Sequence, residues 1–155
     1  MIQRIQTLYL LVIVVLSVFG FFMPMATLLS AESAEVYKLT FKGLLEQTAA
    51  ANVLVQNIWA LSFLMAVSPA IALVSIFLFK NRLLQIRLQI INIIFYAGFY
   101  LLLFIYVWQF VQKLQLDWTI HIVTAFPLIN IILSVLAIRA IGKDEALVKS
   151  LNRLR

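Results

Sequence analysis

Two long runs without a charged residue, 47–79 and 88–112, are separated by the short basic segment 80–87. A Lys or Arg at the centre of a bilayer costs about 2.5 to 3.5 kcal/mol, so Lys80, Arg82 and Arg87 must lie among the headgroups or beyond them. The segment is therefore predicted to be a loop between two membrane spans. Short loops with an excess of basic residues stay in the cytoplasm, so this loop also orients the rest of the chain.

The composition supports an integral membrane protein. Hydrophobic residues make up 65% of the chain and charged residues 12%, whereas soluble domains are nearer half and a quarter. The absence of cysteine excludes disulfides, thiolate metal sites and thiol redox chemistry. The net charge of +6 does not indicate nucleic-acid binding, because the basic residues flank apolar runs and form no stripe with interleaved aromatics.

The apolar runs predict four spans. The first is too long for the apolar core of a signal peptide, which has about 7 to 15 residues, and Pro24 is expected to bend or end it near the outer face. The last uncharged run, 118–138, has 21 residues and would be about 31 Å long as a helix, just enough to cross. The predicted layout is one membrane domain, 1–155, with spans at about 6–28, 53–79, 88–111 and 119–139, an outer loop at 30–52, a cytoplasmic loop at 80–87 and a cytoplasmic tail at 140–155.

Two segments alternate with a period of two, which is typical of strands. They are 35–42 and 113–119, and both are predicted to lie outside. We expect them to pair as a small cap on the bundle, while 44–51 is expected to form a helical turn that leads into the second span. The predicted fold class is an all-α membrane protein: a four-helix bundle with a two-stranded β element on its outer face and a cytoplasmic amphipathic C-terminal helix.

Charge asymmetry predicts that both termini are cytoplasmic. This arrangement places nine basic residues inside and leaves Lys38, Lys42 and Lys113 outside, in accordance with the positive-inside rule. The three tryptophans then fall at the outer ends of their spans, where an indole buries its ring and keeps its N–H in water. The predicted location is a membrane that the chain crosses several times.

The predicted spans lack the side chains that membrane enzymes and pumps use. They contain no Asp, Glu, Lys or Arg, and His121 is expected at the outer end of the fourth span as a headgroup contact. A single histidine cannot supply both axial ligands of a haem. The sequence therefore predicts no enzymatic activity, no cofactor and no metal.

Three polar residues are predicted at membrane depth. Asn92 lies in the third span, and Asn130 and Ser134 lie one turn apart in the fourth. Such side chains usually bond another helix, and a ligand site is the alternative. A kink at Pro127 is expected to open space beside Asn130.

Small residues predict close helix packing. Ser62, Ala66 and Ala70 recur every four residues in the second span, and Gly98 offers a notch in the third. The partner helix could belong to this chain or to another protein.

The tail from 143 to 155 is predicted to be a short amphipathic helix on the cytoplasmic surface. Asp144 and Glu145 fall in its first turn and basic residues fall near its end, which complements a helix dipole. Either anionic headgroups or a partner protein could hold it. The predicted contact residues of this end are Arg139, Lys143, Leu147, Lys149, Leu151, Arg153, Leu154 and Arg155.

The two ends of the chain resemble a known family. Met-Ile-Gln-Arg-Ile-Gln at 1–6 and Arg-Ala-Ile-Gly-Lys-Asp-Glu-Ala-Leu-Val-Lys-Ser at 139–150 are similar to a family of small bacterial inner-membrane proteins classed as domain of unknown function 4293. Gly142 departs from the family pattern, which prefers a basic residue there. The resemblance implies a four-span fold and a membrane location, and it brings no activity with it.

Two functions are consistent with the sequence. The first is a non-enzymatic accessory or scaffold subunit of a larger inner-membrane assembly, favoured by the missing catalytic groups and the small-residue stripe. The alternative is a binder or passive carrier of a lipid or apolar small molecule, favoured by the prolines and the aromatic third span. The expected partners are membrane lipids and a membrane protein or a second copy of the chain, without nucleic acid.

Overall fold

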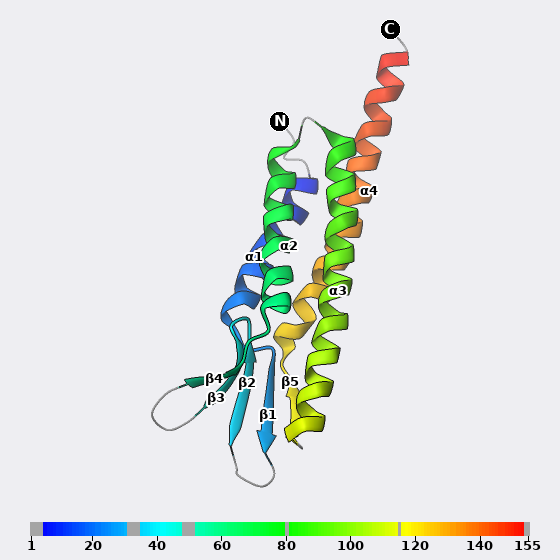
Figure 1. Ribbon diagram of the computed structural model, residues 1–155. Helices are drawn as coiled ribbons and strands as arrows, with labels where there is room; N and C mark the ends of the chain where they lie inside the picture. Colours follow the sequence, from blue (N-terminus) through cyan, green and yellow to red (C-terminus); the bar gives the residue numbers. More distant parts are fainter. Residues whose placement is uncertain (1–4, 31–34, 48–51, 80, 115, 154–155) are drawn as a thin grey trace.

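The computed structural model describes residues 5–30, 35–47, 52–79, 81–114 and 116–153. Its side chains are described as far as residue 146. Within this part of the chain, four helices form a bundle and five strands form a sheet at one end of it (Figure 1). The helices are α1 (Ile5–Phe22), α2 (Trp59–Phe77), α3 (Arg82–Leu114) and α4 (Phe126–Arg153), and the 3-10 turn η1 (Ile122–Ala125) precedes α4.

Each helix packs against two neighbours, in the cyclic order α1, α2, α3, α4. All four are long and apolar enough to cross a membrane. The two ends of the chain and the α2–α3 junction lie at one end of the bundle, and the sheet lies at the other (Figure 1). The expected bundle of four apolar helices is therefore confirmed.

The sheet is larger than the sequence predicted. Its strands are β1 (Ala26–Ser30), β2 (Val36–Thr40), β3 (Gly43–Gln47), β4 (Asn52–Gln56) and β5 (Leu116–Ile120), in the antiparallel order β4-β3-β2-β1-β5. The prediction that 35–42 pairs with 113–119 is wrong, because β1 lies between them: Leu28 is opposite Tyr37 on one side and opposite Trp118 on the other. The prediction of a helical turn at 44–51 is also wrong, since β3 occupies most of its described part.

These strands shorten the predicted spans. α1 ends at Phe22, two residues before Pro24, and the chain then continues as β1. α2 begins at Trp59, because 52–56 pairs with β3, and α4 begins at Phe126, because β5 and η1 take up 116–125. Short uncharged runs suit a strand as well as a helix, so hydropathy alone placed them in the membrane spans.

Two helices are longer than expected. α3 begins at Arg82, so most of the predicted cytoplasmic loop 80–87 is helical and the turn is confined to a few residues before it. α4 runs without a break to Arg153, so the prediction of a separate helix lying on the membrane surface is wrong. Asp144 and Glu145 lie in the middle of this long helix and not in the first turn of a short one. No proline interrupts it after Pro127, which sits in its first turn and therefore causes no kink.

Asp144 holds three helices together at the end opposite the sheet. The Gln6 amide of α1 donates a hydrogen bond to the Asp144 carboxylate. The Arg82 guanidinium of α3 donates to the Asp144 carbonyl oxygen of α4 at 2.7 Å. The first residues of α1 and α3 are thus fixed to the long last helix.

Replacement of two glycines by alanine is expected to change the stability of the protein in opposite directions. Gly142 lies within α4 and a Cβ added there would meet no atom within 4 Å, so Gly142→Ala should raise the free energy of unfolding by about 0.5 to 1 kcal/mol through helix propensity. Gly43 has a φ of +143° at the start of β3, and a Cβ there would collide with the carbonyl oxygen of Gln56. Gly43→Ala should therefore lower stability. Denaturant titration in detergent measures both, and equal signs would contradict this account.

Candidate functional site

An apolar groove lies between the last third of α3 and the strand β5. It encloses about 550 Å³. Trp108 of α3 and Trp118 of β5 both line it, and their side chains are 59% and 53% exposed. The other lining residues are Tyr100, Leu103, Phe104, Val107, Val111, Gln112, Ile120 and Thr124.

The groove extends past the other helices because α3 is the longest. With 33 residues it is about 50 Å long, whereas α1 and α2, with 18 and 19 residues, measure about 27 and 28 Å. The last turns of α3 therefore lie beside the sheet (Figure 1).

Tyr100 fixes the wall of the groove to the start of α4. Its hydroxyl donates a hydrogen bond to the Thr124 carbonyl oxygen at 2.6 Å and accepts one from the Leu128 backbone N–H at 2.9 Å. The hydroxyl thus bridges the Thr124 carbonyl and the Leu128 N–H, and this N–H is one of the first in α4, which have no partner within the helix. This contact fixes the start of α4 against α3.

A second hollow lies on the other side of Tyr100, around His121. It encloses about 620 Å³ and is lined by residues of α3, β5, η1 and α4. The His121 Nε2 atom lies 2.6 Å from the Thr27 hydroxyl of β1, and the His121 backbone N–H donates to the Met25 carbonyl. His121 therefore joins η1 to β1 at the sheet end of the bundle.

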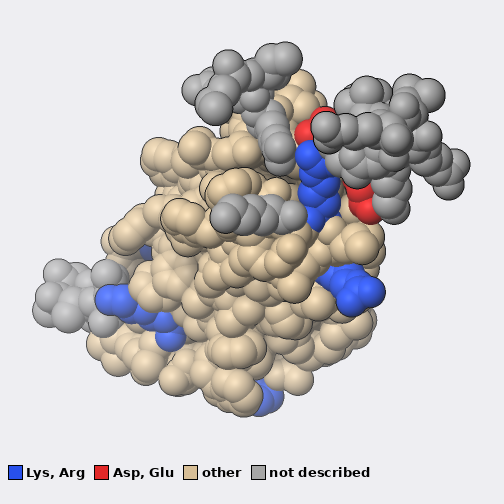
Figure 2. Space-filling model, turned by 90° about the horizontal axis from the view of Figure 1, so that it is seen from above, with Lys and Arg blue, Asp and Glu red and all other residues tan. Residues whose placement is uncertain are grey.

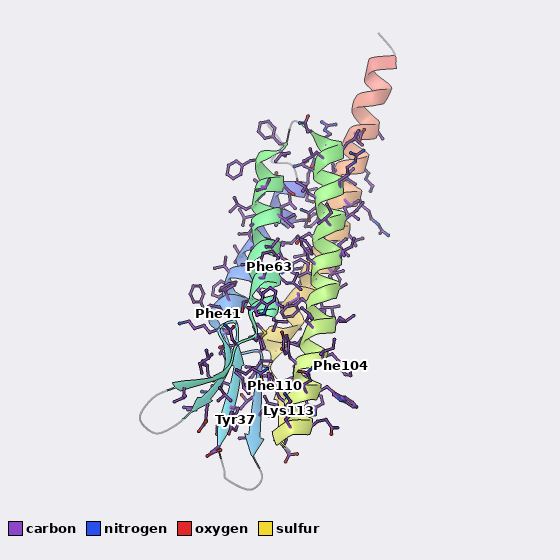
Figure 3. The ribbon with its side chains drawn as sticks, viewed as in Figure 1. Tyr37, Phe41, Phe63, Phe104, Phe110 and Lys113 are labelled. Carbon is purple, nitrogen blue, oxygen red and sulfur yellow. The ribbon has the colours of Figure 1, made fainter. Side chains whose placement is uncertain are left out.

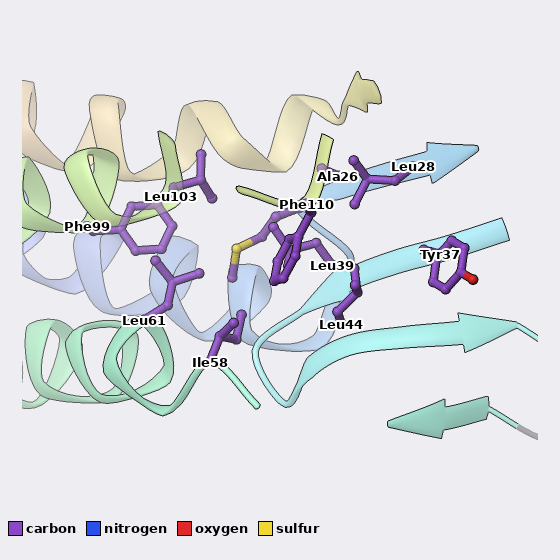
Figure 4. Close-up of a cluster of buried hydrophobic side chains, with 11 residues drawn as sticks. Ala26, Leu28, Tyr37, Leu39, Leu44, Ile58, Leu61, Phe99, Leu103 and Phe110 are labelled. Atoms are coloured by element: carbon purple, nitrogen blue, oxygen red, sulfur yellow. The ribbon is translucent and has the colours of Figure 1, made fainter. Parts of the chain in front are cut away.

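An apolar core joins the sheet to the bundle behind the groove. Phe110 of α3 is 1% exposed and packs with Leu28, Leu39 and Leu44 of the sheet (Figure 4). Phe104, on the other side of α3, is 66% exposed (Figure 3). One helix therefore builds the core with one face and the groove with another.

Tyr37 is part of the same core and has the only pKa shift to note among the strands that the structure describes. Its hydroxyl donates a hydrogen bond to the Glu35 carboxylate at 2.9 Å. This bond, the burial of the ring and the negative charges of Glu35 and Glu46 raise the pKa of Tyr37 above its usual value. The tyrosine stays neutral and donating throughout the physiological range.

Of the three polar residues expected at membrane depth, Asn130 bonds two other helices, as predicted. The Asn130 amide of α4 donates to the Ser17 hydroxyl of α1 at 3.0 Å and to the Tyr96 hydroxyl of α3 at 3.2 Å. Asn92 and Ser134 are both fully buried. Ser17 and Tyr96 were not predicted from the sequence. Tyr96 could have been, because one face of α3 has polar residues at helical spacing: Gln85, Gln89, Asn92 and Tyr96.

The small residues of α2 face outward. Ala66 and Ala70 are exposed, and the inner face of α2 is formed by Leu61, Ser68, Ala72 and Ser75. Ala66 and Ala70 therefore do not pack against a helix of this chain, which was one of the two possibilities for the predicted stripe. Ser62 instead donates a hydrogen bond to the Phe41 carbonyl oxygen in the β2–β3 turn. Gly98 lies next to Leu64 of α2, as a packing notch should.

The predicted contact residues of the tail are only partly described. Arg139 and Lys143 are exposed on α4. Basic side chains seen from this end of the molecule form separate patches, and acidic side chains lie beside one of them (Figure 2). The side chains of Leu147, Lys149, Leu151, Arg153, Leu154 and Arg155 lie outside the described part of the structure.

The described residues contain no group of three His, Cys, Asp or Glu side chains that could hold a metal ion. The groove has an apolar wall with Gln112 and Thr124 as its amide and hydroxyl groups. Its chemistry suits the binding of apolar surface.

Fold and groove define a small protein of four apolar helices with an antiparallel sheet built onto one end. The chain belongs to the family described as Domain of unknown function (DUF4293), whose model matches residues 2–154. The family resemblance of the two terminal motifs is thereby confirmed. No curated protein and no solved structure matches the chain.

Truncation of an aromatic side chain to alanine is expected to affect stability differently on the two faces of α3. Phe110→Ala removes a buried ring from the core and should lower the free energy of unfolding by about 3 to 5 kcal/mol. Phe104→Ala removes an exposed ring of the same size and should change it by about 0.5 kcal/mol or less. Unfolding followed by tryptophan fluorescence in detergent compares the two, and similar losses would show that Phe104 is part of the core.

Proposed function

We propose that this protein is a non-enzymatic accessory or scaffold subunit of a larger assembly in the bacterial inner membrane. Its four helices cross the bilayer, and its sheet lies on the outer side. It acts by binding a membrane-protein partner and has no turnover of its own. The observation that carries this proposal is the apolar groove along the extended part of α3.

The groove presents apolar surface at and beyond the membrane boundary. A hydrocarbon core of about 30 Å matches the lengths of α1 and α2, so it leaves about 20 Å of α3 outside. Large apolar patches in water mark interaction sites, and tryptophan is enriched among the residues that dominate binding energy. Phe104, Trp108 and Trp118 give this groove such a surface.

The charge distribution supports the proposed orientation. Arg82, Arg87, Arg139 and Lys143 belong to the end that carries both termini. The sheet end has its lysines interspersed with Glu35, Glu46 and Asp117. Basic residues favour the cytoplasmic side, so the termini lie inside and the sheet outside.

Cysteine labelling tests this orientation without background, since the chain has no cysteine. Lys42→Cys in the β2–β3 turn should react with a membrane-impermeant maleimide in intact cells. Leu84→Cys, an exposed position at the start of α3, should react only after the membrane is opened. The reverse pattern would place the sheet in the cytoplasm.

A photoreactive residue in place of Trp108 tests the proposed partner. It should cross-link one membrane protein in stoichiometric yield, whereas the same residue at Phe63, which is equally exposed but lies on α2 outside the groove, should not. Loss of an aromatic anchor costs about 2 kcal/mol or more, so Trp108→Ala should weaken the complex about 30-fold. Phe63→Ala should leave it intact. Equal cross-linking at both positions would refute the role of the groove.

The alternative function, binding or passive carriage of a lipid or apolar small molecule, is favoured by the volume of the same groove. Its 550 Å³ lies within the range of small-molecule sites, and its wall is almost wholly apolar. Native mass spectrometry of protein extracted in mild detergent separates the two functions. A retained lipid that is lost in Trp108→Ala, with no protein partner, would support the alternative.

A further inference from the structure

Three helices contribute side chains to a buried polar layer in the middle of the bundle, which we call a polar rung. Ser17, Tyr96 and Asn130 come from α1, α3 and α4, and their side chains are 7%, 4% and 1% exposed. The Ser17 and Tyr96 hydroxyl oxygens lie 3.0 Å apart, and the Asn130 amide nitrogen donates to both. The Asn130 Oδ1 atom is buried and accepts no hydrogen bond from the described residues.

A second rung lies one turn closer to the basic end. Asn92 precedes Tyr96 by four residues on α3, and Ser134 follows Asn130 by four on α4. The two helices run in opposite directions, so these steps lead to the same level (Figure 1). Both polar atoms of the Asn92 side chain and the Ser134 hydroxyl are buried without a hydrogen-bond partner among the described residues.

A small cavity adjoins the first rung. It encloses about 20 Å³, and polar side chains from all four helices and η1 line it: Ser17, Ser68, Tyr96, Thr124 and Asn130. The space is large enough for a water molecule, which needs about 10 to 15 Å³ and two to four polar partners. Most of its wall is apolar, and these five polar side chains supply the partners that a bound water needs.

We propose that this cavity binds water, and that a water molecule donates a hydrogen bond to Asn130 Oδ1. A buried polar atom that is left unpaired destabilises the fold, and a bound water removes that cost. The site is independent of the groove and of the proposed partner.

The chemistry of the lining selects water over a metal cation. The polar groups of the lining are hydroxyls and the Asn130 amide, and water can donate to them and accept from them. No carboxylate lines the cavity, so a cation would find no anionic ligand there. An apolar ligand is too large for 20 Å³ and would leave Asn130 Oδ1 unpaired.

Thr124 lies between this cavity and the outside of the protein. It lines the inner cavity and also both outer hollows beside Tyr100. Its hydroxyl is held by the Met25 carbonyl at 2.7 Å, so it forms the wall between inside and outside. Bound water should therefore exchange with solvent through the sheet end of the bundle.

Radiolytic labelling in H₂¹⁸O tests the proposal on the full-length protein in detergent. Hydroxyl radicals generated from a bound water label the side chains beside it, so Tyr96 and Met65, which line the cavity, should take up ¹⁸O. Phe110 is an equally buried aromatic residue away from the cavity, and Tyr96 should be labelled at least about tenfold faster. Equal labelling of Tyr96 and Phe110 in the folded protein would overturn the proposal.

Two glycines supply a matched pair of variants. Gly20 lines the cavity, and a Cβ there would fit at 3.4 Å from the Met65 Cε atom. Gly98 lies on α3 away from the cavity, and a Cβ there would fit at 3.8 Å from Leu64. Gly20→Ala should displace the water and reduce Tyr96 labelling several-fold, and Gly98→Ala should leave it unchanged.

Asn130→Leu provides a second check that does not depend on the glycines. It removes the unpaired oxygen and fills the space with apolar atoms, so Tyr96 labelling should fall in the same way. Intact unfolding transitions confirm that the variants are folded. Labelling of Tyr96 that is unaffected by both Gly20→Ala and Asn130→Leu would show that the label comes from bulk solvent and would refute a bound water.

Discussion

The length of α3 is the constraint on which the rest of the structure depends. α1 and α2 have 18 and 19 residues, but α3 continues for several turns past their ends and becomes the support for the sheet. Phe110 anchors the sheet on one face of this extension, and Phe104 and Trp108 form the groove on another. Nearer the basic end, Asn92 and Tyr96 of the same helix carry the polar rungs.

The structure has two different interiors along one axis. At the junction with the sheet, aliphatic and aromatic side chains fill the centre and contribute stability through burial. Towards the basic end, amides and hydroxyls face one another across the helices. In the proposed membrane location, burial of apolar surface would not drive association between the helices, and directional hydrogen bonds and close packing would specify their arrangement there.

The sequence predicts the helices of this fold better than its strands, for a physical reason. Long uncharged runs identified four helices, and Pro24 marked the end of the first, because proline cannot continue a helix. Ala26–Ser30 and Asn52–Gln56 are short and uncharged, so nothing in their hydropathy separates them from the neighbouring spans. Asn92, Asn130 and Ser134 could be named as buried, but the groove depends on α3 passing β5, which is a consequence of strand order and not of any local motif.

The strand order also dictates when the molecule can be completed during synthesis. β1 follows directly after the first helix, yet its partner β5 follows only after the second and third helices. In the proposed topology, β5 reaches β1 only when the third helix has crossed the bilayer. The open edge of β1 must therefore persist while more than half of the chain is made. Pairing with β5 covers that edge, so the sheet can be completed only after the third helix has been inserted.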